Sequence, residues 1–294
     1  MSELAAALAR ATPLLLTGLA VALAFRAGIW NIGAEGQFYA GAIAATWVGT
    51  RLGLGSPWEA LVVVPAVAVA AGVAWAAVPA YLRLRFGVLE VITTILLNFV
   101  AELLVSFLVQ GPLQESAHTY PQSDPIAAAA RLPALVRGSG LTWAFPAAVL
   151  LAVVLWVVLS RTRAGLAVRA VGASPAAARV GGRIAVGRVT TVTFLASGAL
   201  AALAGAAEVS GVTFALYERL SPGYGYSAIA VALLARLHPL AVVGTALLFG
   251  ALEAGAAELQ RTAGIPSVTV YAIEALVILA VVVLDRRARR ADVG

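Results

Sequence analysis

The stretch that decides the fold is SRTRAGLAVRAVGASPAAARVGGRIAVGR, residues Ser160–Arg188. It carries six arginines and no acidic residue, and it separates two long apolar runs, Leu141–Leu159 and Val189–Val212. Short arginine-rich loops between membrane-length apolar runs are retained in the cytoplasm. The stretch therefore predicts two membrane spans joined by a basic cytoplasmic loop, residues 161–188.

A short helix is expected inside this basic loop. Ser174 is a good N-cap, and Pro175 suits the first helical position, where a missing N–H costs nothing. Residues 176–179 favour helix, and Gly181 and Gly182 can end it. Two interpretations stay open at this point: a solvated helical turn in an ordinary loop, or a docking helix for a cytoplasmic partner.

The composition of the chain sets its structural class. Hydrophobic residues make up 62% of the 294 residues and charged residues 12%, with a mean hydropathy of +0.95. Soluble domains carry about a quarter charged residues. The apolar runs repeat at membrane length, about 17–25 residues, and the short alternating strands of a barrel are absent from the sequence. We therefore expect an all-α, polytopic transmembrane helical bundle, with residues 1–294 forming one transmembrane domain.

Charge and missing residue types exclude several functions. The net charge of +6 comes mostly from arginines at the ends of apolar runs, where they set topology and meet lipid head groups, so no nucleic-acid partner is expected. The chain has no cysteine and hence no thiol chemistry or disulfide. It has no lysine, which excludes a complete Walker A motif. His118 and His238 lie too far apart in sequence to suggest a metal site. We expect no enzymatic activity and no cofactor, and any ATP hydrolysis must come from another polypeptide.

The apolar runs predict about nine spans, one of them too short to cross alone. The basic segments place the C-terminal anchor Asp285–Arg290 in the cytoplasm and the N-terminus outside. Residues 111–140 become an external loop, with one short amphipathic helix near Ile126–Leu135. The expected spans are Leu4–Phe25, Phe38–Leu52, Glu59–Leu82, a fourth starting near Phe86, Leu141–Leu159, Val189–Val212, Tyr226–Leu234, Leu240–Ala257 and Ser267–Leu284. Small residues at Gly198, Ala202 and Ala206 predict close helix packing.

Two groups of polar residues are candidates for the transport pathway. In Ala27–Tyr39, three glycines interrupt the apolar pattern and bring polar side chains to the margin of a span. The segment is either a broken helix lining the pathway or a glycine-rich turn in which Glu35 pairs with an arginine such as Arg26. On the fourth span, polar residues spaced four apart share a helical face that must point into protein or water. Helix-to-helix bonding is the alternative to ligand contact there. The pathway candidates are Asn31, Glu35, Gln37, Thr94, Asn98 and Glu102, and Glu90 is expected on the same face as the last three.

Four blocks of sequence resemble the permease subunit of an ABC importer, in the branch that serves simple sugars and nucleosides. They are GIWNIGAEGQ (28–37), FGVLEVITTILLNFVAE (86–102), RAVGASPAAARVGG (169–182) and SPGYGYSAIAVALLAR (221–236). The resemblance implies about ten helices with the N-terminus inside. We therefore expect this chain to lack one hydrophobic segment before the counterpart of Thr12–Leu23.

The resemblance also implies partners. It assigns ATPase coupling to the segment Arg169–Gly182, with a second homologous permease and an extracytoplasmic substrate-binding protein or lipoprotein completing the importer in the cell membrane. The coupling candidates are Arg169, Ser174, Pro175, Ala177, Arg179 and Gly181. The function expected is import of a nucleoside or simple sugar. The alternatives are an ion-coupled secondary transporter using Glu90 or Glu102, and a channel or structural membrane subunit.

Overall fold

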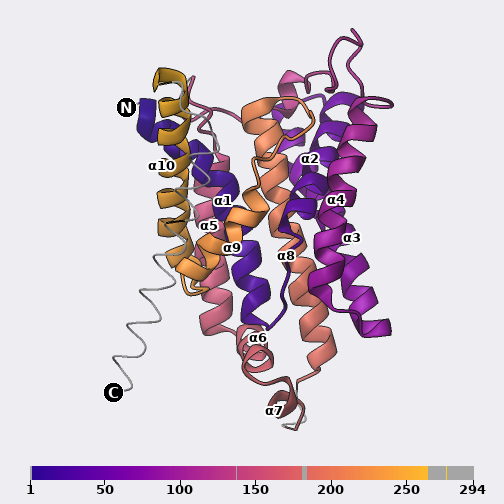
Figure 1. Cartoon of the computed structure of the whole chain (residues 1–294), viewed down its shortest axis with the longest axis vertical. Coiled ribbons are helices and arrows are strands. Elements are labelled where there is room, and N and C mark those ends of the chain that lie inside the picture. Colours follow the sequence, from indigo (N-terminus) through magenta and orange to yellow (C-terminus); the bar gives the residue numbers. More distant parts are fainter. Residues whose placement is uncertain (1, 137, 181–183, 264–275, 277–294) are drawn as a thin grey trace.

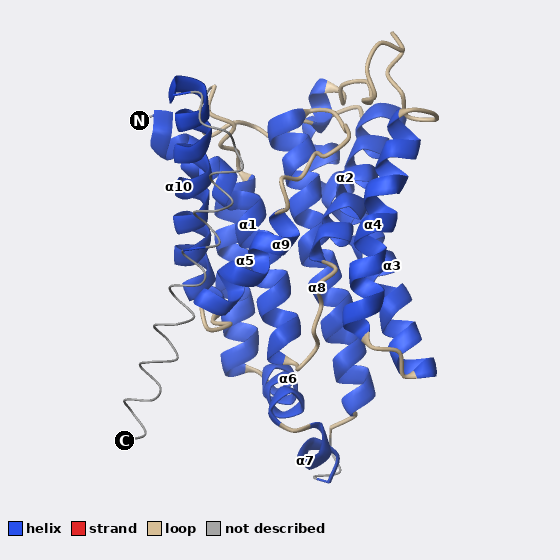
Figure 2. Cartoon of the chain, in the orientation of Figure 1, coloured by secondary structure: helices blue, strands red, loops and turns tan. Residues whose placement is uncertain are grey.

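The computed structural model describes residues 2–136, 138–180, 184–263 and 276. Within these ranges the chain is helical and contains no strand (Figure 2). A 3-10 turn at Ala128–Ala130 and a π-helical turn at Val209–Thr213 supplement the α-helices. In chain order the α-helices are α1 (Ser2–Arg26), α2 (Ala34–Arg51), α3 (Pro57–Phe86), α4 (Glu90–Val109), α5 (Ala144–Arg161), α6 (Arg163–Ala173), α7 (Pro175–Val180), α8 (Val186–Glu208), α9 (Tyr224–Leu234) and α10 (Pro239–Ala263).

Six of these helices, α1, α3, α4, α5, α8 and α10, are long and apolar enough to cross a membrane. With α2 and the 11-residue α9 they account for eight of the nine expected spans. The ninth, Ser267–Leu284, and the anchor Asp285–Arg290 lie outside the described residues. The prediction of an all-α transmembrane bundle is confirmed, and the count of nine is approximate.

The two ends of the bundle differ in character (Figure 1). One end carries α6, α7 and the arginines that close α1, α3 and α5, and we call it the basic end. The opposite end carries the segment 111–140 and the start of α1, and we call it the loop end. The basic loop and the 111–140 segment thus lie at opposite ends of the molecule, as the arginine pattern requires.

Two crossings are broken halfway. After α1 ends at Arg26, residues 27–33 run without helix from the basic end to the middle of the bundle, where α2 begins (Figure 1). After α8, the segment 214–223 returns from the loop end to the same depth, where α9 begins (Figure 1). Irregular backbone at this depth is tolerated only where protein or a water-filled cavity surrounds it. The expected broken helix at Ala27–Tyr39 and the half-helix at Tyr226–Leu234 are both observed.

Helix α8 is the central packing element, because small residues let α2 and α3 approach its backbone. A Cβ atom at Gly205 would overlap the carbonyl oxygen of Phe38 on α2. A Cβ atom at Gly198 would lie 2.6 Å from the carbonyl oxygen of Gly72 on α3. Ala202 lies between them against Gly41 and Gly72. The predicted close approach through small residues is confirmed.

The prediction of an external amphipathic helix near Ile126–Leu135 is wrong. Only Ala128–Ala130 forms a 3-10 turn. The backbone N–H groups around it are used elsewhere: Ile126 N–H donates to Phe214 O at 2.8 Å, and Leu132 N–H donates to Ser210 O at 2.8 Å. Pro133, which has no N–H, follows directly. The segment is therefore tied to η2 (Val209–Thr213) and to the residue after it.

Side-chain hydrogen bonds hold the start of the 111–140 segment in place. The Glu115 carboxylate accepts hydrogen bonds from the Gln122 side chain at 2.6 Å and from the Tyr120 N–H at 2.8 Å. These two hydrogen bonds lower the pKa of Glu115, and the bond from Gln122 has the larger effect. A carboxylate whose pKa is lowered in the folded chain stabilises the loop while it is ionised. Its contribution to the free energy of unfolding is therefore lost as the pH falls through the folded-state pKa.

We expect Gly205→Ala to destabilise the bundle by about 1–3 kcal/mol, the usual range for overpacking a tight core. The measurement is the unfolding midpoint of the purified chain in detergent. Gly244→Ala on α10 is the matched control, because a Cβ atom there meets no heavy atom within 4 Å. Equal midpoints for the two variants would contradict the close approach of α8 to α2.

Candidate functional site

A cluster of buried polar side chains lies where α2 and α9 begin. Its members come from the irregular segment, from the first turn of α2 and from α4, and each is at most 1% exposed. They are Asn31, Glu35, Gln37, Thr94 and Asn98. The structure therefore brings together five of the six residues proposed from the sequence for the pathway, and all five are covered by protein in this conformation.

Asn31 and Gln37 bind each other and α8. The Asn31 amide nitrogen donates to the Gln37 side-chain oxygen at 3.0 Å and to Ser197 Oγ at 2.9 Å. Ser197 in turn donates to the carbonyl oxygen of Ala20 at 2.8 Å. The Asn31 side-chain oxygen accepts the N–H of Gly33 at 2.9 Å. One amide thus joins the broken segment to α8 and, through Ser197, to α1.

Asn98 ties α4 to both broken crossings. Its side-chain oxygen accepts the N–H of Gly36 at 2.8 Å, and its amide nitrogen donates to Ile32 O at 3.0 Å. The same nitrogen donates to the Tyr226 hydroxyl on α9 at 3.3 Å. Asn98 therefore satisfies backbone groups that the break before α2 leaves without helical partners.

Glu35 lies between two helix N-termini. It belongs to the first turn of α2, and its carboxylate accepts the N–H of Gly225, in the first turn of α9, at 2.6 Å. A carboxylate is favoured at such positions because the first N–H groups of a helix carry partial positive charge. A Cβ atom at Gly225 would overlap the backbone of Glu35, so only glycine allows this approach. The partner of Glu35 is therefore the N-terminus of α9 and not Arg26, the partner that the sequence suggested.

Glu90 has a structural ion pair. Its carboxylate is 2.6 Å from the Arg83 guanidinium and accepts the N–H of Trp30 at 3.3 Å. These contacts join the α3–α4 turn to the start of the irregular segment. Arg83 therefore balances the charge of Glu90 in this conformation, which argues against the use of Glu90 as an ion-coupling carboxylate.

The prediction that Glu102 shares the buried face with Glu90, Thr94 and Asn98 is wrong, because Glu102 is exposed on this chain. A helix turns once per 3.6 residues, so each four-residue step drifts by about 40° and three steps by about 120°. The buried face of α4 continues instead through Ala101 and Val105. Glu102 stands among exposed apolar side chains, including Phe99 and Leu103, each more than half exposed.

A strip of polar side chains continues from Glu102 along the exposed side of α4, and sequence reasoning missed it. Ser106 and the Gln110 amide each donate to the Glu218 carboxylate at 2.6 Å. Tyr226 on α9 is 40% exposed, and its hydroxyl accepts a hydrogen bond from Asn98, which lies one turn of α4 before Glu102. The strip combines an aromatic ring, two carboxylates, an amide and a hydroxyl. We call Glu102, Ser106, Gln110, Glu218 and Tyr226 the α4–α9 strip.

The coupling candidates lie at the basic end on two short helices. Ser174 caps α7 as predicted, its Oγ accepting the Ala177 N–H at 3.2 Å. Gly181 lies outside the described residues. Arg169 belongs to α6, a helix that sequence reasoning missed although Thr162 caps it by accepting the Gly165 N–H at 3.1 Å. Helix α7 lies beyond the ends of the membrane-length helices, and α6 lies beside the start of α8 at the basic end (Figure 1).

Helix α6 is fixed to the bundle while α7 points outward. A Cβ atom at Gly172 would overlap the carbonyl oxygen of Arg26, so α6 lies directly on the point where α1 ends. On α7, Ala178 is buried against the bundle, whereas Val180 is 89% exposed.

In the described part of the chain, no group of three or more His, Asp or Glu residues is placed to hold a metal ion. The buried amides and carboxylate bind backbone groups, and the exposed strip offers hydrogen-bonding groups and an aromatic face. Such an arrangement can bind a polar solute and release it.

We expect Asn98→Leu, which keeps the side-chain size, to destabilise the chain by about 1–3 kcal/mol, because the Gly36 N–H and Ile32 C=O lose their partner. The measurement is again the unfolding midpoint in detergent. Leu96→Asn, on the exposed side of the same helix, is the reciprocal control and leaves these two backbone groups paired. An unchanged midpoint for Asn98→Leu would show that the break before α2 does not depend on this amide.

Comparison with known proteins gives the family. The family model described as branched-chain amino acid transport system / permease component matches residues 4–284. The chain is 41% identical to a glucose ABC transporter permease protein of Haloferax volcanii, over 92% of this chain and 74% of that protein. It is 36% identical to a guanosine ABC transporter permease protein of Bacillus subtilis, over 91% and 77%.

A third relative is a nucleoside ABC transporter permease protein of Lactococcus lactis, 30% identical over 92% of this chain and 76% of that protein. No solved structure matches the chain. The family match spans the bundle, the broken crossings and helices α6 and α7. The chain belongs to the family of permease components of ABC transport systems to which the branched-chain amino acid permeases also belong.

Proposed function

We propose that this chain is one of two homologous permease subunits of an importer that moves a nucleoside or a simple sugar into the cell. The similarity to glucose, guanosine and nucleoside permeases supports this cargo class. The α4–α9 strip is the observation that carries it. An aromatic face with neighbouring carboxylate and amide groups suits a neutral solute with several hydroxyl groups, which must be bound by hydrogen bonds.

The proposed pathway runs along the α4–α9 strip, between this chain and the second permease. Glu102 is exposed among apolar side chains, and a carboxylate facing lipid at mid-span costs several kcal/mol, about 2.5–3.5 on insertion scales. A water-filled pathway or a partner helix removes that cost. Asn31, Glu35, Gln37, Thr94 and Asn98 form the layer behind the strip and hold the ends of α2 and α9 in position.

The proposed route of coupling starts at α7, which docks on a cytoplasmic ATPase. Motion of α7 passes through α6 to the end of α1, because Gly172 lies on the Arg26 carbonyl. From there it reaches residues 27–33 and the buried cluster. This assignment places the basic end and the C-terminus in the cytoplasm and the loop end outside, where a substrate-binding protein delivers the solute.

Reconstitution tests the proposed function directly. The chain, co-expressed with its ATPase and second permease, is inserted into vesicles, and ATP-driven uptake of radiolabelled guanosine and glucose is measured in the presence of the binding protein. We expect saturable uptake of one of the two that needs ATP. Uptake that continues without the ATPase and collapses with an ion gradient would instead establish the secondary transporter.

We expect Glu102→Ala to raise the KM for uptake roughly 10-fold or more, because one hydrogen bond to a charged group contributes about 1.5–3 kcal/mol. Its unfolding midpoint should not change, since the side chain is exposed. Glu258→Ala, at an exposed carboxylate on α10, is the control and should leave KM unchanged. A normal KM in Glu102→Ala would remove Glu102 from the pathway.

We expect a cysteine at Ala177 to cross-link to cysteines in the ATPase, because Ala177 is exposed on α7 and the native chain has no cysteine. The measurement is the yield of cross-linked complex on denaturing gels, with and without ATP. Ala178→Cys is the matched control, since Ala178 is buried against the bundle. Equal yields at the two positions would contradict docking through the outer face of α7.

A further inference from the structure

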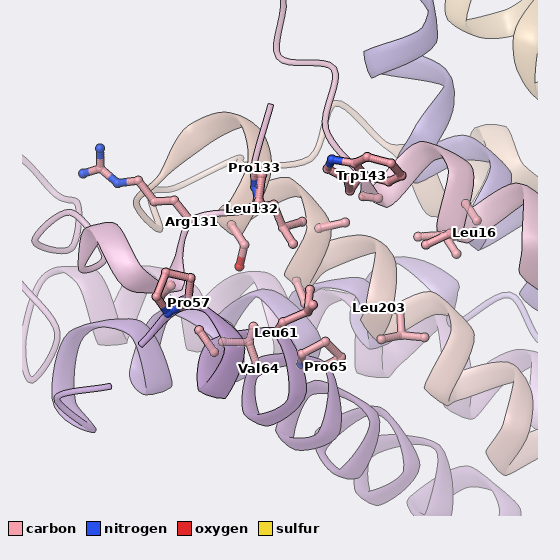
Figure 3. A pocket seen from close by; sticks show the side chains of 18 of the residues that line it. Leu16, Pro57, Leu61, Val64, Pro65, Arg131, Leu132, Pro133, Trp143 and Leu203 are labelled. Carbon is pink, nitrogen blue, oxygen red and sulfur yellow. The ribbon is translucent and has the colours of Figure 1, made fainter. Parts of the chain in front are cut away.

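An apolar crevice opens between α3 and α5 near the loop end (Figure 3). Its volume is about 460 Å³, within the range of ligand-sized pockets. Helix α3 packs mainly on α2 and α8, whereas α5 packs on α1 and α10, and a gap is left between them. Leu16, Leu203 and Ala206 form its floor, and the segment 129–133 closes it toward the loop end.

The crevice opens toward the lipid and away from the α4–α9 strip. The side chains at its rim are apolar and exposed: Trp58 is 79%, Leu61 45%, Trp143 56% and Leu150 63% exposed. Tryptophan is enriched at the level of the lipid head groups, so the two indoles mark that depth. No residue of α4 or α9 lines the crevice.

The polarity of the lining changes along the crevice. Toward the basic end it is lined by aliphatic side chains such as Val64 and Leu203. At the loop end lies Ser210, 2% exposed, whose hydroxyl has no hydrogen-bond partner in the described part of the chain. Arg131 lines the same end, and its guanidinium lies over the Phe214 ring at 4.8 Å, directed out of the crevice (Figure 3). This gradient matches a molecule with a polar head and an apolar tail.

We propose that the crevice binds one glycerophospholipid of the outer leaflet. Its acyl chain lies between α3 and α5, and its ester carbonyl accepts a hydrogen bond from the Ser210 hydroxyl. An empty apolar gap loses the dispersion contacts of its lining, and an acyl chain restores them. A buried hydroxyl without a partner costs free energy that an ester oxygen removes. The bound lipid braces α8, which also carries Ser197, the hydrogen-bond partner of Asn31.

A helix of the second permease fits the crevice less well. A helix with its side chains is about 10–12 Å wide and needs a continuous groove along its length. This crevice is closed at the loop end by residues 129–133 and narrowed by the exposed Trp58 and Trp143 at its rim. The bilayer, in contrast, supplies acyl chains at this position at all times.

A photoreactive lipid tests the site. The chain with its co-expressed partners is reconstituted with a phospholipid carrying a diazirine in its acyl chain, irradiated, and digested for mass spectrometry. We expect adducts on residues 144–151 and 203–210. Ala147→Phe, which fills the crevice, should lower these adducts at least 5-fold. The matched control Val154→Phe on the exposed face of α5 should not.

A second measurement isolates the contribution of the Ser210 hydroxyl to lipid binding. Ser210→Ala should weaken retention of a diacyl phospholipid 2- to 10-fold, the effect of one hydrogen bond. It should leave retention of the corresponding diether lipid, which lacks the carbonyl, unchanged. Equal labelling of the Ala147→Phe and Val154→Phe variants, or cross-links from the crevice to the second permease, would overturn the proposal. Uptake assays are not needed, so its failure is distinct from failure of the proposed transport function.

Discussion

The hydrogen bond from the Gly225 N–H to the Glu35 carboxylate joins the two points where the bundle is broken. A helix that begins inside a membrane exposes N–H groups that water cannot reach. Here α2 and α9 begin at the same depth, and a carboxylate in the first turn of α2 accepts an N–H from the first turn of α9. The contact requires glycine at 225, because a Cβ atom there would overlap the backbone of Glu35.

The small residues of α8 make the polar cluster possible. Asn31 reaches Ser197 only because α2 and α3 approach the α8 backbone at Gly198, Ala202 and Gly205. Close packing also keeps water and lipid out, and without water each buried amide must be satisfied by protein. Packing through glycine and hydrogen bonding through asparagine are therefore two parts of one arrangement, and a larger residue on α8 would disturb both.

Much of the architecture follows from local rules in the sequence. Apolar length and the arginine pattern predicted the helices and their order, and the Ser174–Pro175 pair predicted α7 with its cap. Other features did not follow. Glu102 was placed on the buried face because its four-residue spacing was extended over three steps, beyond which the helix turns away. Helix α6 was missed although Thr162 caps it, because it follows directly on α5 and packs on α5 and α1 through Gly165 and Gly172. The partners of Glu35, Asn98 and Tyr226 are distant in sequence, and no local pattern specifies them.

The hydrogen bonds around Asn98 serve two kinds of partner, backbone groups of the irregular segment and a side chain on α9. Its bonds to Gly36 and Ile32 are 2.8 and 3.0 Å long and serve backbone groups that have no helical partner. Its bond to the Tyr226 hydroxyl is 3.3 Å long, and Tyr226 is 40% exposed, so that hydroxyl can bond water or solute instead. Close-packed interiors transmit displacement and do not absorb it. Under the proposed coupling route, a displacement of α6 at Arg26 reaches residues 27–33 first and then Asn98, which bonds their backbone at Ile32.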